Sequence, residues 1–157
     1  MDPWVVAALW LHTVAFVIAW GYYGILGRFV IPALARALGP EGQVAALVEI
    51  ERRALPFLAL AVVIFTLTGT YLLVADDRYE GLGNVGTLWA QLLLAKHVLV
   101  LLLLALGAAV GMLVRAAGAA SSETARSVAL RRVRLAAEAA TALGALVALT
   151  TAAMQVA

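Results

Sequence analysis

The chain has 157 residues, of which 65% are hydrophobic and 13% charged, and its mean hydropathy is +1.02. A water-soluble domain of this length could not carry so apolar a surface, so the composition indicates a membrane protein. The absence of cysteine excludes disulfides and thiolate metal sites, and the net charge of +2 does not indicate nucleic-acid binding, because the basic residues lie at the ends of apolar segments.

Four apolar segments follow one another along the chain, and each exceeds the about 20 residues that cross a bilayer as a helix. They cover residues 3–38, 42–75, 87–115 and 121–156. Their runs are continuously apolar, whereas the strands of a membrane barrel would alternate apolar and polar residues over about ten positions. We therefore expect one all-α domain over residues 1–157, an integral membrane four-helix bundle.

Arginine is concentrated at two of the three connections between these segments. The first and last connections are flanked by Arg28, Arg36, Arg52, Arg53, Arg115, Arg126, Arg131, Arg132 and Arg134. The middle connection, DDRYEGLGNVG at residues 76–86, has one arginine against three acidic residues. By the positive-inside rule the first and last connections are cytoplasmic, so both termini lie outside the cytoplasm. The sequence thus predicts a multi-pass protein of the cell (inner) membrane.

Two histidines lie inside the first and third segments, in ALWLHTVAFVIAW and QLLLAKHVLVLL. At a rise of about 1.5 Å per residue, His12 lies roughly 13 Å from the start of its helix and His97 roughly 15 Å from the start of its own. Because the two helices run in the same direction, both imidazoles lie at one depth in the outer half of the membrane. Facing imidazoles in a bundle are a usual way to hold haem iron. We therefore predict haem b, with His12 and His97 as its metal ligands.

The residues around the histidines suit a flat macrocycle. Ala15 and Ala19 share the helical face of His12 and leave room, and Phe16 offers a ring for stacking. Threonine hydroxyls at the same depth would bond the imidazole N–H groups, as metal-bound histidines need. The threonines at about this depth are Thr66, Thr68 and Thr70 in the second segment and Thr150 and Thr151 in the fourth. Of these, Thr66 and Thr70 are predicted to belong to the cofactor site. The inner half, by contrast, is expected to be almost pure Ala, Leu, Val and Gly.

Lys96 directly precedes His97 inside an apolar segment. An ionisable side chain there costs free energy unless it is paired, so it usually has a partner or a function. Lys96 points about 100° away from His97 around the helix, and its long stem reaches toward the outer surface. A haem propionate would be a suitable partner, so Lys96 is predicted to bind the edge of the cofactor. Snorkelling to the interface without a ligand is the alternative interpretation.

The segments LHTVAFVIAWGYYGILGRFVIPAL and GTLWAQLLLAKHVLVLLLLALG resemble the CopD-like membrane proteins and their relatives, the HemJ-type protoporphyrinogen oxidases, over most of the chain. Both groups are bundles with a histidine in the first helix, matched by His12, and a lysine in a leucine-rich helix, matched by Lys96. Similarity to the HemJ type implies haem b and oxidation of protoporphyrinogen, and similarity to CopD implies copper handling. His97 departs from both patterns and supplies a second imidazole.

An iron with two imidazole ligands has no open position, so we expect electron transfer, with a quinone or another electron carrier as redox partner. Copper is the weaker cofactor, because the three methionines are scattered in depth. The glycine stripe Gly21, Gly24 and Gly27 is consistent with close helix packing or a homodimer. A HemJ-type oxidase, CopD-like copper transport and a colourless structural subunit stay as alternatives.

Overall fold

The computed structural model describes residues 2–81 and 85–157, which form helices and no strand. In chain order the elements are α1 (Pro3–Ile25), η1 (Leu26–Val30), α2 (Ile31–Ala37), α3 (Pro40–Val74), α4 (Leu88–Ala119) and α5 (Glu123–Ala153). Positions 82–84 of the predicted middle connection lie outside the described residues. The third predicted helix continues past Arg115 to Ala119, and the fourth ends at Ala153.

Short polar side chains fix where three of the helices begin. Asp2, Thr87 and Ser122 each accept a hydrogen bond from a backbone N–H in the first turn of the helix that follows, at 2.9–3.2 Å. Each bond satisfies a donor that has no partner inside the helix. α3 begins instead at Pro40, whose fixed φ suits the first helical position and whose missing N–H is not needed there.

One turn of the first span is wider than a regular α-helix. η1 is a π-helical turn at Leu26–Val30, and Pro32 follows it in the first turn of α2. Proline lacks a backbone N–H, and its ring would clash with a carbonyl group of a regular preceding turn. The wider turn admits the proline without ending the helix. α1, η1 and α2 therefore form one span of 35 residues.

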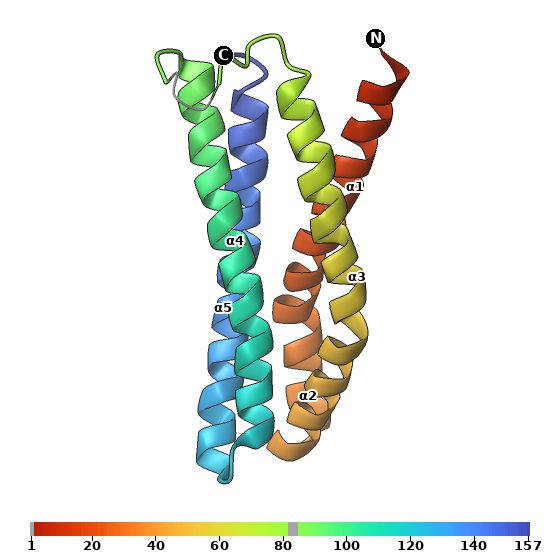
Figure 1. Ribbon diagram of the computed structural model, residues 1–157. Coiled ribbons are helices and arrows are strands. Elements are labelled where there is room, and N and C mark those ends of the chain that lie inside the picture. The colour runs from red at the N-terminus through yellow and green to blue at the C-terminus, as the bar shows by residue number, and fades with distance from the viewer. Residues whose placement is uncertain (1, 82–84) are drawn as a thin grey trace.

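Four spans that are long and apolar enough to cross a membrane lie side by side in one bundle (Figure 1). α1 packs chiefly against α3, and α4 packs chiefly against α5. Both chain termini and the α3–α4 connection lie at one end, which we term the terminal end. The α2–α3 and α4–α5 connections lie at the other, which we term the basic end. The all-α membrane bundle predicted from composition is confirmed.

α1 crosses the bundle obliquely, so that its two halves have different neighbours (Figure 1). Near the terminal end, His12 contacts α3. Farther along, Nε1 of Trp20 donates to a backbone carbonyl oxygen of α5 at 2.8 Å. A methyl group on Gly24 or Gly27 would contact α5 at 3.6 or 3.3 Å, whereas nothing lies within 4 Å of one on Gly21. Two glycines of the stripe therefore serve packing within the chain.

The larger core cluster lies toward the basic end, and a smaller one, formed by Trp89, Leu93 and Met154, lies at the terminal end. The largest fully buried side chains are Leu26, Leu47, Val110 and Val133. They come from four different elements and meet in the larger cluster. Toward the terminal end, the buried residues that the described parts of α1 and α3 contribute are alanines: Ala8, Ala15 and Ala61. Between α1 and α3, small side chains are thus buried near the depth of His12, and large ones toward the basic end.

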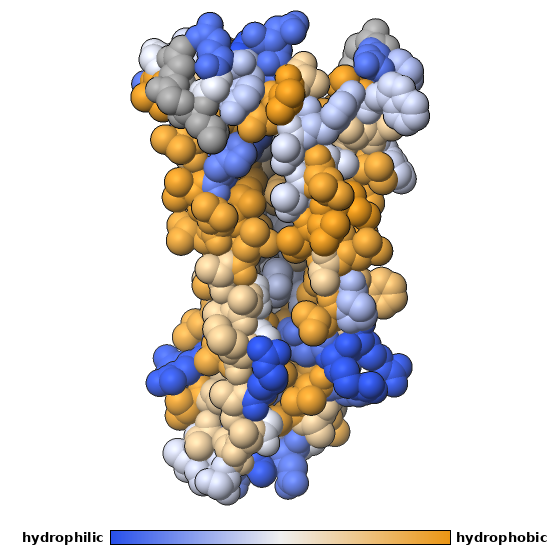
Figure 2. Space-filling model, in the orientation of Figure 1, coloured by the Kyte–Doolittle hydropathy of each residue, from blue (hydrophilic) through white to orange (hydrophobic). Residues whose placement is uncertain are grey.

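Hydrophilic side chains form a band near the basic end, with apolar surface on both sides of it (Figure 2). Exposed ion pairs in this part of the chain join Arg52 and Arg53 to Glu49 on α3, and Arg134 to Glu138 on α5. At about 1.5 Å per residue, roughly 31 Å separate Arg53 from the terminal end of α3, and roughly 29 Å separate Arg134 from that of α5. Both lengths match a hydrocarbon layer of about 30 Å, so the band fits one membrane boundary.

Candidate functional site

His12 lies in the interface between α1 and α3. Its Nδ1 is 3.0 Å from the backbone carbonyl oxygen of Phe65 and 3.1 Å from Oγ1 of Thr68. A carbonyl oxygen can only accept, so Nδ1 carries the hydrogen and donates it. The Thr68 hydroxyl donates to the carbonyl oxygen of Ile64 at 2.6 Å, so it turns an electron pair toward the ring. In this neutral tautomer the free electron pair lies on Nε2, which forms no hydrogen bond within the described part of the chain.

Phe65 and Gly69 shape the space that the imidazole occupies. The ring stacks on Phe65, with centroids 4.1 Å apart and planes inclined by 19°. At Gly69, one turn farther along α3, a Cβ atom would lie 2.8 Å from Cε1 of His12. Such a contact is too short for any side chain, so only glycine admits the ring in this position. α3 therefore supplies an acceptor, a stacking surface and free space on one helical face.

The residues predicted to share the face of His12 are found along the same side of α1. Ala15 is buried and Ala19 is half-buried. Phe16 lies near Phe65 of α3, with ring centroids 6.1 Å apart, and its ring stacks on Trp20 at 5.6 Å. The structure thus brings Ala15 and Phe16 to the α1–α3 interface beside His12, with aromatic rings on its basic side.

Of the three threonines predicted in α3, Thr68 alone forms a hydrogen bond with His12 in the described structure, and the two assigned to the cofactor site do not. Thr66 and Thr70 are at exposed positions, and their hydroxyls donate to carbonyl oxygens one turn earlier in α3. Thr68, between them, is the threonine that reaches His12. Residues two positions apart in a helix point in nearly opposite directions, so one face cannot hold all three. The spacing of Phe65, Thr68 and Gly69 was the sequence signal for the face that meets α1.

The inward face of α4 carries Lys96 and not His97. Trp89, Leu93 and Leu103 are buried, and Lys96 belongs to the same series, seven residues from Trp89 and from Leu103. Lys96 is half-buried, whereas His97, about 100° farther around the helix, is exposed. In a membrane-spanning helix the exposed side faces lipid or another chain. The residue of α4 that faces the interior at the depth of His12 is therefore the lysine.

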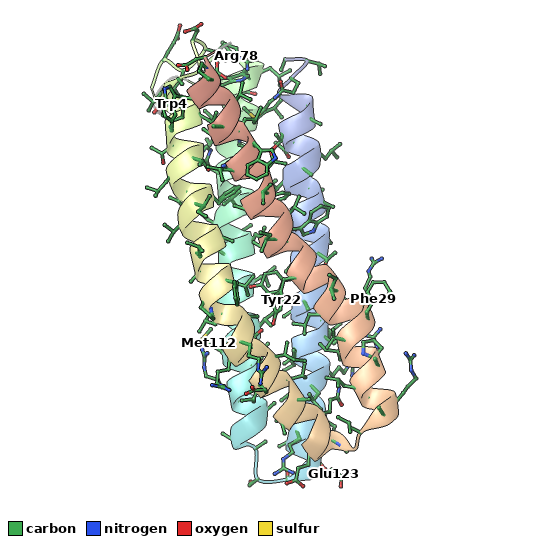
Figure 3. The ribbon with its side chains drawn as sticks, turned by 90° about the vertical axis from the view of Figure 1, so that its right-hand side faces the viewer. Trp4, Tyr22, Phe29, Arg78, Met112 and Glu123 are labelled. Carbon is green, nitrogen blue, oxygen red and sulfur yellow. The ribbon has the colours of Figure 1, made fainter. Side chains whose placement is uncertain are left out.

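A group of charges lies on the terminal side of His12. Lys96 is close enough to His12 and to Asp76, just beyond the end of α3, to interact electrostatically with both. Asp76 accepts hydrogen bonds from Nε and Nη2 of Arg78, each at 3.1 Å. These bonds hold the pKa of Asp76 below its usual range. Figure 3 shows Arg78 at this end of the bundle. The half-buried lysine therefore shares one carboxylate with an arginine.

His97 is hydrogen-bonded within its own helix. Its Nδ1 donates to the carbonyl oxygen of Leu93 at 2.7 Å, which leaves the free electron pair on Nε2, as in His12. No hydrogen bond or ring contact joins the two histidines in the described structure. Nor do three or more metal-binding side chains gather anywhere in residues 2–81 and 85–157. Ligation by both histidines stays a prediction.

A polar contact that sequence reasoning missed lies nearer the basic end. The hydroxyl of Tyr22 on α1 donates to Oε1 of Glu51 on α3 at 3.0 Å, and Tyr22 points into the bundle (Figure 3). Arg115 of α4 lies close enough to attract the carboxylate. The contact lies at the level of the hydrophilic band, next to Arg52 and Arg53 in α3, so the expectation of an almost purely apolar inner half stays a prediction. The spacing of seven residues from buried Ala15 to Tyr22 was the available signal.

No protein-family model, curated protein or solved structure matches the chain. The resemblance to CopD-like and HemJ-type proteins therefore stays a prediction from the quoted segments. What the chain binds has to be inferred from His12, Lys96 and their surroundings.

Proposed function

We propose that the chain binds haem b in the terminal half of its bundle, with His12 as an axial ligand, and transfers electrons. The observation that carries this proposal is the hydrogen bond from Nδ1 of His12 to the carbonyl oxygen of Phe65. It fixes the tautomer whose Nε2 can bind iron. A bond from the second ring nitrogen to a carbonyl group is the usual companion of a metal-bound histidine, because it orients the ring and raises its basicity.

The surroundings of His12 support a flat, largely apolar cofactor. Small buried residues, Ala8, Ala15 and Ala61, lie on the two helices that hold the ring. Lys96 supplies a positive charge at the same depth, and a propionate group would balance it. Haem, when bound, supplies one-electron exchange, and the side chains of this chain hold it, orient it and keep water away.

The second ligand and the partners belong to the same proposal. The sequence predicts His97, whose Nε2 is free to bind iron. Because His97 is exposed, ligation by it requires α4 to turn by about 100° about its axis. Two imidazoles would leave the iron no open site, which favours exchange of electrons with a quinone or another carrier over oxygen chemistry. Exposed leucines of α4, such as Leu94 and Leu101, offer a surface for a homodimer.

Absorption spectroscopy of the detergent-purified protein tests the proposal. We expect a Soret band in the wild-type protein and its loss, or a change to high spin, in His12→Ala, because the variant lacks an axial ligand. His97→Ala, at the same depth, should turn the spectrum high-spin if His97 is the second ligand. A low-spin spectrum that survives His97→Ala but not Lys96→Ala would identify lysine instead. A His12→Ala protein with unchanged haem content and spectrum would contradict the proposal.

The alternative functions have distinct signatures in the same preparation. Bound copper without a Soret band would indicate CopD-like copper transport. Oxidation of added protoporphyrinogen by the coloured protein would indicate a HemJ-type oxidase. A colourless, metal-free protein would indicate a structural subunit, with His12 serving only to join α1 to α3.

A further inference from the structure

Two polar groups on the inward face of α4 form no hydrogen bond within residues 2–81 and 85–157. Trp89 is only 5% exposed, and its indole Nε1 forms no hydrogen bond among the described residues. Lys96 is half-buried, and its ammonium group forms no hydrogen bond or ion pair in residues 2–81 and 85–157. A hydrogen-bond donor or a cation left unpaired in apolar surroundings costs free energy. A ligand that offers a hydrogen-bond acceptor to both groups would remove this cost.

The two groups lie on the same side of α4. Trp89 and Lys96 are seven residues apart, which places them two turns apart on one side of α4, with buried Leu93 between them. Side chains of a helix lean toward its N-terminus, so the long lysine stem extends toward the level of the indole. Both donors therefore lie on the side of α4 that faces the interior of the bundle, toward its terminal end.

The charges around these groups favour an anion. The guanidinium carbon of Arg78 lies 5.0 Å from the centroid of the Trp89 ring and covers it. The hydrogen bonds of Arg78 occupy Asp76, the carboxylate that also attracts Lys96. A single carboxylate thus serves two cations. The ammonium group of Lys96 itself has no hydrogen-bonded acceptor among the described residues, so it is available to a negatively charged ligand.

We propose that the indole N–H of Trp89 and the ammonium group of Lys96 bind the carboxylate of an apolar ligand at the terminal end of the bundle. A carboxylate accepts from both donors, and the apolar remainder of the ligand lies along the small residues near His12. Two sources supply this chemistry, a haem propionate and a fatty acid. The inference rests on the proposed function for the first source only.

Binding of matched acids and esters tests the site. The wild-type protein from haem-deficient cells is titrated with haemin and its dimethyl ester, and separately with palmitate and methyl palmitate. At least one acid should bind at least about tenfold more tightly than its ester, because the ester lacks the charge that the two donors bind. Trp89→Phe and Lys96→Gln should each remove most of this preference. Trp4→Phe, an exposed tryptophan at the same end, should leave it unchanged.

The outcomes separate this inference from the proposed function. Palmitate preferred over its ester, without haemin binding, would support the carboxylate site and overturn the haem proposal. Haemin bound through His12 with no preference over its ester would overturn the carboxylate site and leave the haem proposal intact. Equal affinities for acids and esters in the wild-type protein contradict the inference directly, even where a variant fails to fold.

Discussion

At Gly69 the backbone of α3 comes so close to α1 that a methyl group would lie 2.8 Å from Cε1 of His12. Gly69→Ala should therefore push the imidazole off Phe65 and break the bond that fixes its tautomer. We expect the haem content of the purified protein, measured as Soret absorbance per mole of protein, to fall severalfold. Gly21→Ala is the matched control, because both changes raise helix propensity by about 1 kcal/mol and nothing lies within 4 Å of a methyl group on Gly21. Equal haem content in the two variants would show that the close approach is unimportant.

The sequence predicted which polar side chain points into the bundle in α1. It could not do so in α4. A lone histidine among alanines and aromatics in α1 indicated an interior site, and its contacts with α3 lie in the interior of the bundle. In α4, by contrast, leucines lie on every side of the helix, so hydropathy could not tell which of Lys96 and His97 points inward. Packing against α3 and α5 decides that, through the burial of Trp89 and Leu93.

Among the elements, α1 and α5 are joined by one large side chain. The Trp20 indole donates to the carbonyl oxygen of Thr141 at 2.8 Å and fills the space above Gly144, where a methyl group would overlap it. Gly144→Ala should force the indole to move and should lower the free energy of unfolding by about 1–3 kcal/mol. Thermal unfolding in one detergent, followed by circular dichroism, measures the effect. Equal midpoints for Gly144→Ala and Gly21→Ala would contradict it.

The number and length of the helices could be predicted from the sequence, because a continuous apolar run of this length spans a membrane as an α-helix. The oblique path of α1 from α3 to α5 could not be predicted from the sequence. It depends on which residues of α5 pack against the glycines of α1, and the glycines alone do not specify those residues. The π-helical turn before Pro32 could not be predicted for a similar reason. A proline predicts that the helix is disturbed, but whether it kinks, ends or widens into a π-helical turn depends on how the neighbouring turns pack.

At the scale of the whole molecule, the structure places both termini at the end away from the arginine-rich connections (Figure 1). The positive-inside rule then predicts that the terminal end faces out of the cytoplasm. Alkaline phosphatase fused after Ala157 should be active, and the same reporter inserted after Ala120, in the α4–α5 connection, should be inactive. The reverse pattern of activity would invert the orientation, and with it the side from which a ligand carboxylate enters.

The unequal packing along α1 and α3 predicts where the bundle opens first. Large side chains such as Leu26 and Val133 lock the basic half, whereas α1 and α3 bury small alanines toward the terminal end. Backbone amides at the terminal ends of α1 and α3 should therefore exchange with solvent deuterium sooner than those around Leu47, since local opening breaks fewer contacts. The basic half then serves as a fixed pivot. We therefore predict that the proposed haem enters and leaves between the terminal ends of α1 and α3, while the basic half stays folded.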